Sequence, residues 1–150
     1  MTRNQADRFL GLRCDVDFGI GIQRGVPRLI DALGSRGISA TFYVTMGPDG
    51  FSRNTSRLSS RSYIGRVRRM QPLRMVQRFG IRYLVKQALG QSGNVGADHP
   101  EVMRTIFNEG HELGVHGYDH FWWAENVWSA PEESIRQDVE RAIDCFTKAV

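Results

Sequence analysis

The alternation of apolar and polar side chains predicts three short strands. Residues 8–14, RFLGLRC, alternate and are expected to form a buried strand that ends at Cys14. Residues 38–46, ISATFYVTM, alternate in the same way and predict a second strand. Residues 112–116, ELGVH, are expected to form a shorter third strand. The glycine-rich stretch at 15–25 is expected to be a loop.

Apolar residues at helical spacing follow each strand. The first helix is expected at 26–37, the second after Asp98, which suits its N-cap, and the third after Ser129, which has capping-box spacing to Glu132. The buried stripes of the three helices are Val26, Leu29, Ile30 and Leu33; Val102, Met103, Ile106 and Phe107; and Ile135, Val139, Ala142, Ile143 and Phe146. This order of strand and helix predicts an α/β fold with parallel strands and three βα units, fewer than the eight that commonly close a barrel.

Charge divides the chain into two unequal parts. Residues 50–97 contain ten basic and no acidic residues, whereas the rest of the chain carries a net charge of −6 and the whole chain +4. Apolar residues are interleaved with the cations, so helical pieces are expected in this segment, which we interpret as a basic insertion between the second strand and the second helix. The cations to which we assign a membrane role are Arg66, Arg68, Arg69, Arg74, Arg78 and Arg82.

Three interpretations of the basic segment compete. It is a solvated cationic face, a nucleic-acid surface, or an interfacial helix on an anionic membrane. Recognised nucleic-acid-binding signatures do not occur in it, so no nucleic-acid partner is expected. The mixture of apolar and basic residues favours the membrane surface.

The bulk properties agree with one cytoplasmic domain. The chain has 150 residues, no apolar run of 18 residues and no signal-peptide pattern at its N-terminus. Its two cysteines, Cys14 and Cys145, do not form a disulfide framework and are expected to be reduced and partly buried.

Residues that could form a functional site lie at the ends of two predicted strands. Asp15 and Asp17 follow the first strand, and His116 ends the third with His120 four residues later. The carboxyl ends of parallel strands meet at one edge of a sheet, so two carboxylates and two imidazoles are expected to converge. One carboxylate and two histidines suffice for a divalent metal, which leaves the second carboxylate as a base toward a metal-bound water.

Each of these features also has a plainer interpretation. An aspartate pair at a strand end is often turn or cap chemistry, and the aromatic residues Phe121, Trp122, Trp123 and Trp128 either belong to the core or wall a cleft for a sugar or lipid. His111 is expected to be either a solvated or a strand-entry residue and His99 a loop residue, and neither is assigned a role. The joint placement of both motifs at one sheet end favours the metal site.

Four segments together resemble one known family. LRCDVD, GVPRLIDAL, ATFYVTMGPDG and HELGVHGYDHFWW are similar to the polysaccharide deacetylase family, also called the NodB-homology family. Within it they are most similar to the deformylases of undecaprenyl-phosphate 4-deoxy-4-formamido-L-arabinose, which belong to lipid A biosynthesis and polymyxin (antibiotic) resistance. The resemblance runs from about Phe9 to Val150 and implies a partial (β/α) barrel of the polysaccharide-deacetylase type.

The resemblance also implies roles for single residues. Asp15 becomes the catalytic base, and Asp17, His116 and His120 become the ligands of a divalent metal, zinc or another divalent ion. Trp122 and Trp123 are expected to contact substrate. The implied reaction hydrolyses the N-formyl group of a lipid-linked amino sugar, a carbon–nitrogen bond outside peptides, on the cytoplasmic face of the inner membrane.

The resemblance further implies that residues 1–150 are the first half of such a domain. The family's later arginine and histidine motifs are expected beyond Val150, so the activity of the isolated fragment is in doubt. The alternatives are a deacetylase of another carbohydrate and a non-catalytic truncated module that binds a membrane or a partner. A non-haem iron oxygenase uses similar ligands, but the βα order argues against its usual scaffold.

Overall fold

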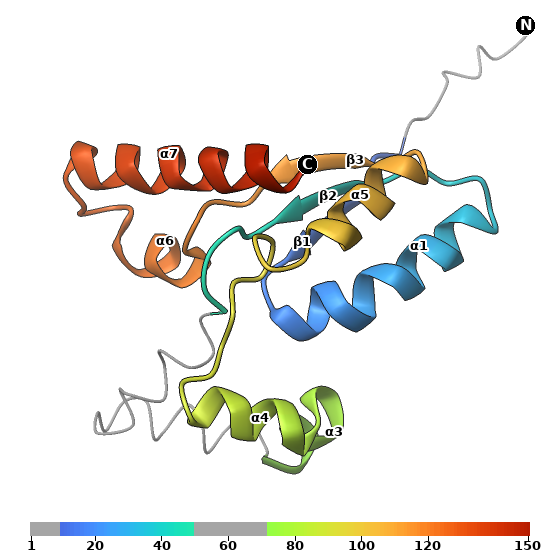
Figure 1. Ribbon diagram of the computed structural model, residues 1–150, viewed down its shortest axis with the longest axis horizontal. Coiled ribbons are helices and arrows are strands. Elements are labelled where there is room, and N and C mark those ends of the chain that lie inside the picture. The colour runs from blue at the N-terminus through green and yellow to red at the C-terminus, as the bar shows by residue number, and fades with distance from the viewer. Residues whose placement is uncertain (1–9, 50–71) are drawn as a thin grey trace, which may run out of the picture.

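The computed structural model describes residues 10–49 and 72–150. Its strands are β1 (Arg13–Val16), β2 (Thr41–Val44) and β3 (Glu112–Val115), which form one parallel sheet in the order β1-β2-β3 (Figure 1). The predicted α/β class and parallel pairing are therefore confirmed. Three neighbouring strands do not by themselves define a barrel, so the partial (β/α) barrel stays a prediction.

Helices connect and flank the strands. A π-helical turn, η1 (Gly21–Gly25), leads into α1 (Val26–Gly34), and α5 (Pro100–Asn108) precedes β3. After β3 come α6 (His120–Asn126) and α7 (Glu132–Ala149), while α3 (Pro72–Phe79) and α4 (Ile81–Ala88) form a separate pair between β2 and α5. Along the described ranges, every helix is too short or too polar to cross a lipid bilayer.

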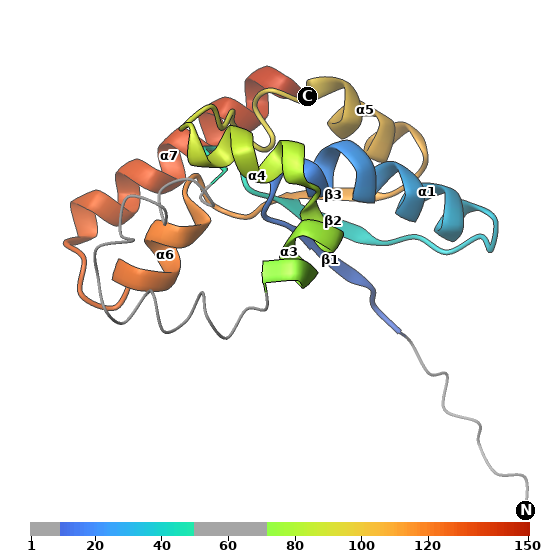
Figure 2. The ribbon, with the colours of Figure 1, turned by 90° about the horizontal axis from the view of Figure 1, so that it is seen from below.

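The hydrophobic core lies on one face of the sheet. Strand residues Val16, Phe42 and Val44 point toward α1, α5 and α7, and these three helices lie on the same side of the strands in Figure 2. Met103 and Ile106 of α5 are fully buried against them. The opposite face, which we call the polar face, carries Arg13, Asp15, Thr41, Tyr43 and Glu112, all exposed or half-buried.

Two boundaries near the N-terminus differ from the prediction. The first strand does not end at Cys14: β1 continues to Val16, because its pairing with β2 runs from Arg13 opposite Thr41 to Val16 opposite Val44. The stretch predicted as a loop at 15–25 is largely helical, since η1 runs directly into α1 without an interruption in helical backbone angles.

Two predicted helix caps are wrong. The N-cap of α5 is His99, while Asp98 accepts hydrogen bonds from Asn94 and thereby closes the preceding turn. The N-cap of α7 is Pro131, and the Ser129 hydroxyl donates to the Asn126 carbonyl instead of capping the helix. In both cases the side chain satisfies a nearby turn, which competes with capping for the same short polar residues.

Both cysteines are free and half-buried, as predicted. Burial raises the pKa of the Cys14 thiol, and the neighbouring Asp15 carboxylate raises it further. The predicted buried stripes are wrong at three residues: Phe107 of α5 is 65% exposed, and Val139 and Ile143 of α7 are 38% and 53% exposed.

Candidate metal centre

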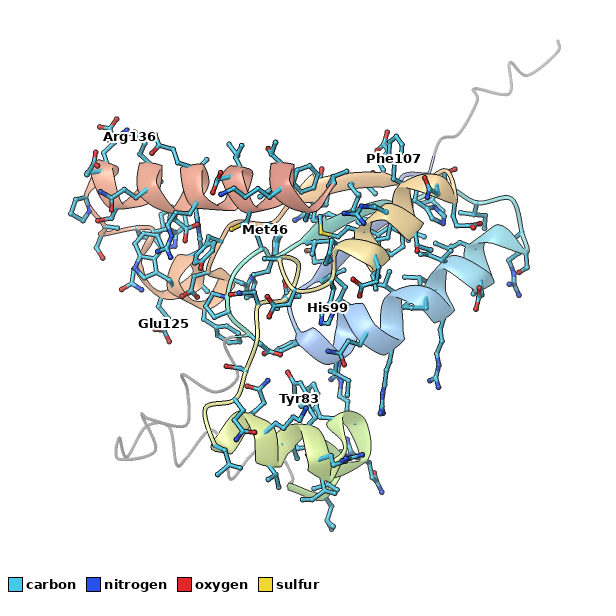
Figure 3. All side chains as sticks on the ribbon, in the orientation of Figure 1. Met46, Tyr83, His99, Phe107, Glu125 and Arg136 are labelled. Atoms are coloured by element: carbon cyan, nitrogen blue, oxygen red, sulfur yellow. The ribbon has the colours of Figure 1, made fainter. Side chains whose placement is uncertain are left out.

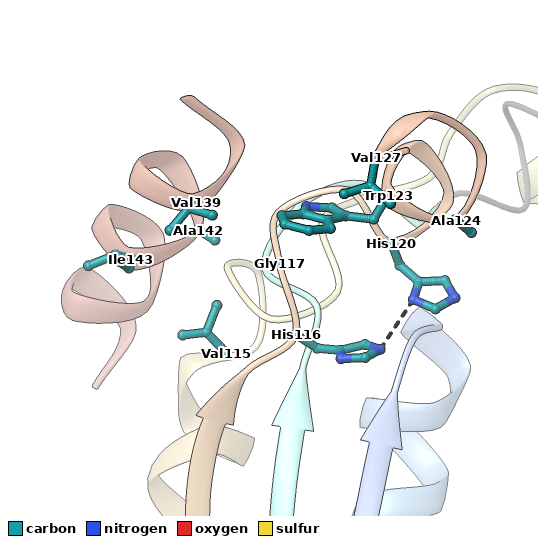
Figure 4. Close-up of a pocket in the computed structure, with 10 residues that line it drawn as sticks. All are labelled: Val115, His116, Gly117, His120, Trp123, Ala124, Val127, Val139, Ala142 and Ile143. Atoms are coloured by element: carbon teal, nitrogen blue, oxygen red, sulfur yellow. Dashed lines mark hydrogen bonds between the residues drawn. The ribbon is translucent and has the colours of Figure 1, made fainter. Parts of the chain in front are cut away.

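Three side chains converge at the carboxyl end of the sheet. Asp17 Oδ1 lies 3.4 Å from His116 Nε2 and 3.6 Å from His120 Nδ1. The two imidazole nitrogens are 3.2 Å apart, and Figure 4 shows the two rings facing one another across this gap. The sequence-predicted ligand set is thus brought together in one place.

The elements account for this convergence. Asp17 follows β1, and His116 continues β3 by donating its backbone N–H to the Val44 carbonyl of β2. Gly117 then turns the chain with φ of +79°, a conformation that glycine adopts without steric cost. The turn places His120 at the first residue of α6, so its ring swings back over His116.

The loop between the two histidines is held on two sides. Met46 and Gly47, which follow β2, donate their backbone N–H groups to the carbonyls of Gly117 and Tyr118. On the other side the Asp138 carboxylate of α7 accepts hydrogen bonds from the same loop. Asp119 caps α6 by accepting from the Trp122 N–H at 3.0 Å.

The spacing of the three atoms fits a metal ion. Ligand atoms at about 2.1 Å from a tetrahedral zinc ion lie about 3.3–3.4 Å from one another, close to the observed separations. Asp17 Oδ1 is also buried and accepts no hydrogen bond among the described residues, which is unusual for a carboxylate oxygen. A cation between the three groups satisfies this oxygen and gives both histidines a common partner.

Asp15 does not join this cluster. Its side chain belongs to the polar face, 39% exposed, where Oδ1 accepts from the Arg13 guanidinium at 2.6 Å. Arg13 in turn lies over the Tyr43 ring at 4.4 Å. The sequence placed Asp15 after the first strand, and its position within β1 sends its side chain to the face opposite Val16.

The two tryptophans assigned to substrate separate into different surroundings. Trp123 lines an apolar hollow of about 580 Å³ between α6 and α7, with His116 and His120 at its margin (Figure 4). Trp122 borders a smaller polar hollow with Tyr118 and Arg141. Phe121 packs edge-to-face on His120, whereas Trp128 is 94% exposed.

Of the two expectations for His111, the structure confirms strand entry, since His111 directly precedes β3 and is only 5% exposed. Its Nδ1 accepts from the Ala40 N–H at 3.2 Å, and its ring packs edge-to-face on Phe42. His99 is partly buried, with its Nε2 2.9 Å from the Gln23 amide. Neither histidine lies in the group of three ligands.

The sequence missed Asp138, although a signal for it exists. Asp138 lies between Ile135 and Ala142 at helical spacing, so it interrupts the buried stripe of α7 with a charged residue. Such a residue on the packed side of a helix needs hydrogen-bonding partners, and here the loop that carries the histidines supplies them.

Of the six arginines assigned to a membrane surface, three are described. Arg74, Arg78 and Arg82 are exposed on α3 and α4, and Arg66, Arg68 and Arg69 lie outside the described residues.

Comparison with known proteins agrees with the geometry of the site. The sequence pattern of the family described as polysaccharide deacetylase matches residues 15–150. A probable 4-deoxy-4-formamido-L-arabinose-phosphoundecaprenol deformylase of Shewanella sediminis is 31% identical over 114 residues. A protein of the same description from Wigglesworthia glossinidia brevipalpis is 31% identical over 104 residues. These matches cover 76% and 69% of this chain but only 36% and 35% of the relatives, so the chain spans about a third of their length.

Proposed function

We propose a function that starts from the family match: this chain belongs to the polysaccharide deacetylase family. We propose that it is the metal-binding part of a hydrolase that removes an N-formyl group from a lipid-linked amino sugar. Two relatives carry the name of a deformylase of such a substrate. The observation that carries the proposal is the convergence of Asp17, His116 and His120 around a buried carboxylate oxygen without a hydrogen-bond donor.

The ligand set defines the metal chemistry that we propose. His116 Nε2, His120 Nδ1 and Asp17 Oδ1 hold a divalent ion, which we take to be zinc, with at least one coordination position left for water or substrate. When bound, such an ion acts as a Lewis acid toward a carbonyl oxygen and lowers the pKa of coordinated water. A divalent ion held by two neutral imidazoles and one carboxylate would keep a net positive charge together with its ligands. That charge would favour an oxyanion developing on the formyl group.

Asp15 is the proposed general base. Its carboxylate is exposed and hydrogen-bonded to Arg13, so taking a proton from water requires it to exchange that partner. Trp122 and Trp123 are proposed to flank the sugar, because Trp123 lines the apolar hollow that also includes His120 and Trp122 borders the smaller polar hollow beside Asp119.

Zinc titration of the chain by calorimetry tests the ligand set. Wild-type protein is expected to bind about one equivalent of zinc, and Asp17→Ala and His116→Ala are expected to lose it. Asp15→Asn is the matched control and is expected to keep the metal. Equal zinc binding by the wild type and both ligand variants contradicts the proposed centre.

Product release distinguishes the function from its alternatives. Formate release from a lipid-linked formamido sugar, abolished in Asp15→Asn, supports the deformylase. Acetate release from an acetylated amino-sugar oligomer in its place supports a deacetylase of another carbohydrate. Metal binding without release of either product supports a non-catalytic module.

We further propose that the pair formed by α3 and α4 rests on an anionic membrane, on the cytoplasmic face of the inner membrane. The pair and the residue that follows it expose Leu73 (79%), Ile81 (61%) and Leu89 (65%) beside arginines, and residues 72–89 include no acidic residue. Exposed apolar side chains next to cations are typical of helices that lie in a membrane interface. This placement brings the site toward a substrate held in the bilayer.

Co-sedimentation with vesicles tests the membrane proposal. Binding to vesicles with anionic lipids is expected to exceed binding to neutral vesicles and to fall when Arg74, Arg78 and Arg82 are changed together to Gln. Replacing the exposed Arg24, Arg28 and Arg104 outside the pair is the control. Equal binding to neutral and anionic vesicles contradicts the proposal.

A further inference from the structure

We propose that Asp138 is a positioning residue that fixes the distance between the two histidine ligands through its hydrogen bonds to the loop that joins them. The proposal rests on the metal centre proposed above and adds a residue outside its ligands. Asp138 lies on α7, far along the chain from the motif, and is 8% exposed.

Three N–H groups point at this one carboxylate. Oδ2 accepts from the backbone N–H of Tyr118 at 3.0 Å and from the indole N–H of Trp123. Oδ1 accepts from the backbone N–H of Asp119 at 3.2 Å. Only Gly117, Tyr118 and Asp119 separate the two histidines, so Asp138 bonds two of the three intervening backbone amides.

The charge of Asp138 strengthens this arrangement. A buried carboxylate needs donors to replace its lost hydration, and hydrogen bonds to an ionised acceptor are about twice as strong as those between neutral groups. The cations near it on α7 have other contacts: Arg136 pairs with Glu133 and Glu140, and Arg141 stacks over the Tyr118 ring at 4.2 Å. The loop amides and the indole are therefore the donors seen at this carboxylate.

The hydrogen bonds of Asp138 affect ligand geometry because the loop is held from both sides. The backbone of Met46 and Gly47 binds the loop carbonyls from the sheet side, while Asp138 binds the loop amides from α7. Gly117 leaves no spare room there, since a side chain at that position would crowd the Trp123 indole. His116 and His120 are thereby kept 3.2 Å apart at their facing nitrogens before any ion is bound.

Asp138→Asn is the variant that tests this role. An asparagine keeps the shape of the side chain but presents an NH₂ group to at least one of the N–H donors, so the loop loses part of its anchor. Its matched control is Asp144→Asn on the same helix, where the carboxylate is exposed and pairs with Lys148. Trp123→Phe removes a single donor and is expected to have a smaller effect.

The first readout is zinc affinity by calorimetry, with the absorption spectrum of bound Co²⁺ as a check on ligand geometry. Loss of a supporting hydrogen bond around a metal site typically weakens affinity about 10- to 100-fold, and we expect a loss in this range for Asp138→Asn. Asp144→Asn is expected to match the wild type. Equal affinity and an unchanged Co²⁺ spectrum in a folded Asp138→Asn variant overturn the proposal.

The second readout needs no metal. Deuterium exchange over residues 117–123 is expected to be slow in the metal-free wild type and faster in Asp138→Asn, because the Tyr118 and Asp119 amides lose their acceptor. If the wild type binds no zinc, the proposed function fails, while this measurement still decides whether Asp138 holds the loop. If Asp138→Asn does not fold, Trp123→Phe decides: unchanged exchange and affinity in that variant reject the proposal.

Discussion

Gly47 is the residue at which backbone contact to the histidine loop is closest. Its N–H donates to the Tyr118 carbonyl at 2.8 Å, and a Cβ at this position would overlap both that oxygen and the Tyr118 ring. The requirement for glycine here arises from contact with a segment about 70 residues away along the chain. The local pattern GPDG indicated only a break after the second strand.

Gly47→Ala is therefore expected to destabilise the protein and to loosen the metal loop. Forcing a methyl group into a packed contact costs about 1–3 kcal/mol of unfolding free energy, which chemical denaturation measures. Gly34→Ala is the control, because an added Cβ there meets no atom within 4 Å. A Gly47→Ala protein as stable as Gly34→Ala means that the loop can move away from Gly47 without loss.

At the same scale, the sequence predicted the convergence of the three candidate ligands but not the surroundings of their neighbours. Two motifs at the ends of parallel strands were enough to predict that Asp17, His116 and His120 meet. The burial of His111 was missed, although it continues the alternation of Leu113 and Val115 onto the core face of β3. Asp15 was expected beside the ligands, because the end of β1 was predicted two residues too early.

At the scale of elements, α3 and α4 are attached to the body of the protein through a few aromatic and polar contacts. Phe79 packs edge-to-face on Phe18, which follows the ligand Asp17. Tyr83 points from α4 toward the sheet (Figure 3), and its hydroxyl donates to Asp49 at 2.5 Å. Asp49 also accepts from the Gly19 N–H at 2.8 Å, so one carboxylate joins α4 to the segment after β1.

This attachment is expected to weaken at alkaline pH. Burial raises the pKa of Tyr83, and the hydrogen bond to Asp49 raises it further. The folded protein thus holds the phenol proton more tightly than the unfolded chain does. The stabilisation is complete below pH about 10, the ordinary pKa of tyrosine, and is lost as pH rises above it.

Ultraviolet absorbance of tyrosinate measures this effect. One of the four tyrosines is expected to ionise later than the rest, and Tyr83→Phe is expected to remove that late component. Tyr43→Phe, on the polar face of the sheet, is the control and leaves the component in place. A titration in which Tyr83→Phe changes only the early part contradicts the buried, hydrogen-bonded state of this phenol.

Element existence was easier to predict than element ends. The apolar stripes correctly predicted α1 and α7, because burial of an amphipathic face stabilises a helix, although Val139 and Ile143 of the α7 stripe are exposed. Caps depend on which of several short polar residues finds a nearby donor, so Asp98 and Ser129 were assigned wrongly. Helical backbone at 21–25 was missed because glycine disfavours it locally and burial of Ile22 compensates.

At the scale of the whole molecule, the order of elements predicted the architecture. Alternating strands and helices require crossovers, and crossovers of one hand put α1 and α5 on the same face of a parallel sheet, where α7, which follows β3, packs against α5 and β3. The contacts of the polar face, such as the hydrogen bond that the Thr41 hydroxyl donates to the Glu112 carboxylate, did not follow from periodicity alone, because alternation says which side chains are buried and not what the others contact.

The separation of paired strands along the chain also sets an order of folding. Ala40 and Thr41 of the second strand region contact partners 71 positions later, whereas a single helix joins β1 to β2. A connection more than twice as long adds about 0.6–0.9 kcal/mol of loop-closure entropy, so β1, α1 and β2 are expected to assemble first. Pulse-labelled hydrogen exchange during refolding should show protection of the β2 amides that bond to β1 before protection of the β3 amides, and simultaneous protection would contradict this order.

This order also bears on how zinc affects the two rates. Because His116 and His120 reach their native positions only when β3 forms, added zinc is expected to slow unfolding far more than it speeds folding.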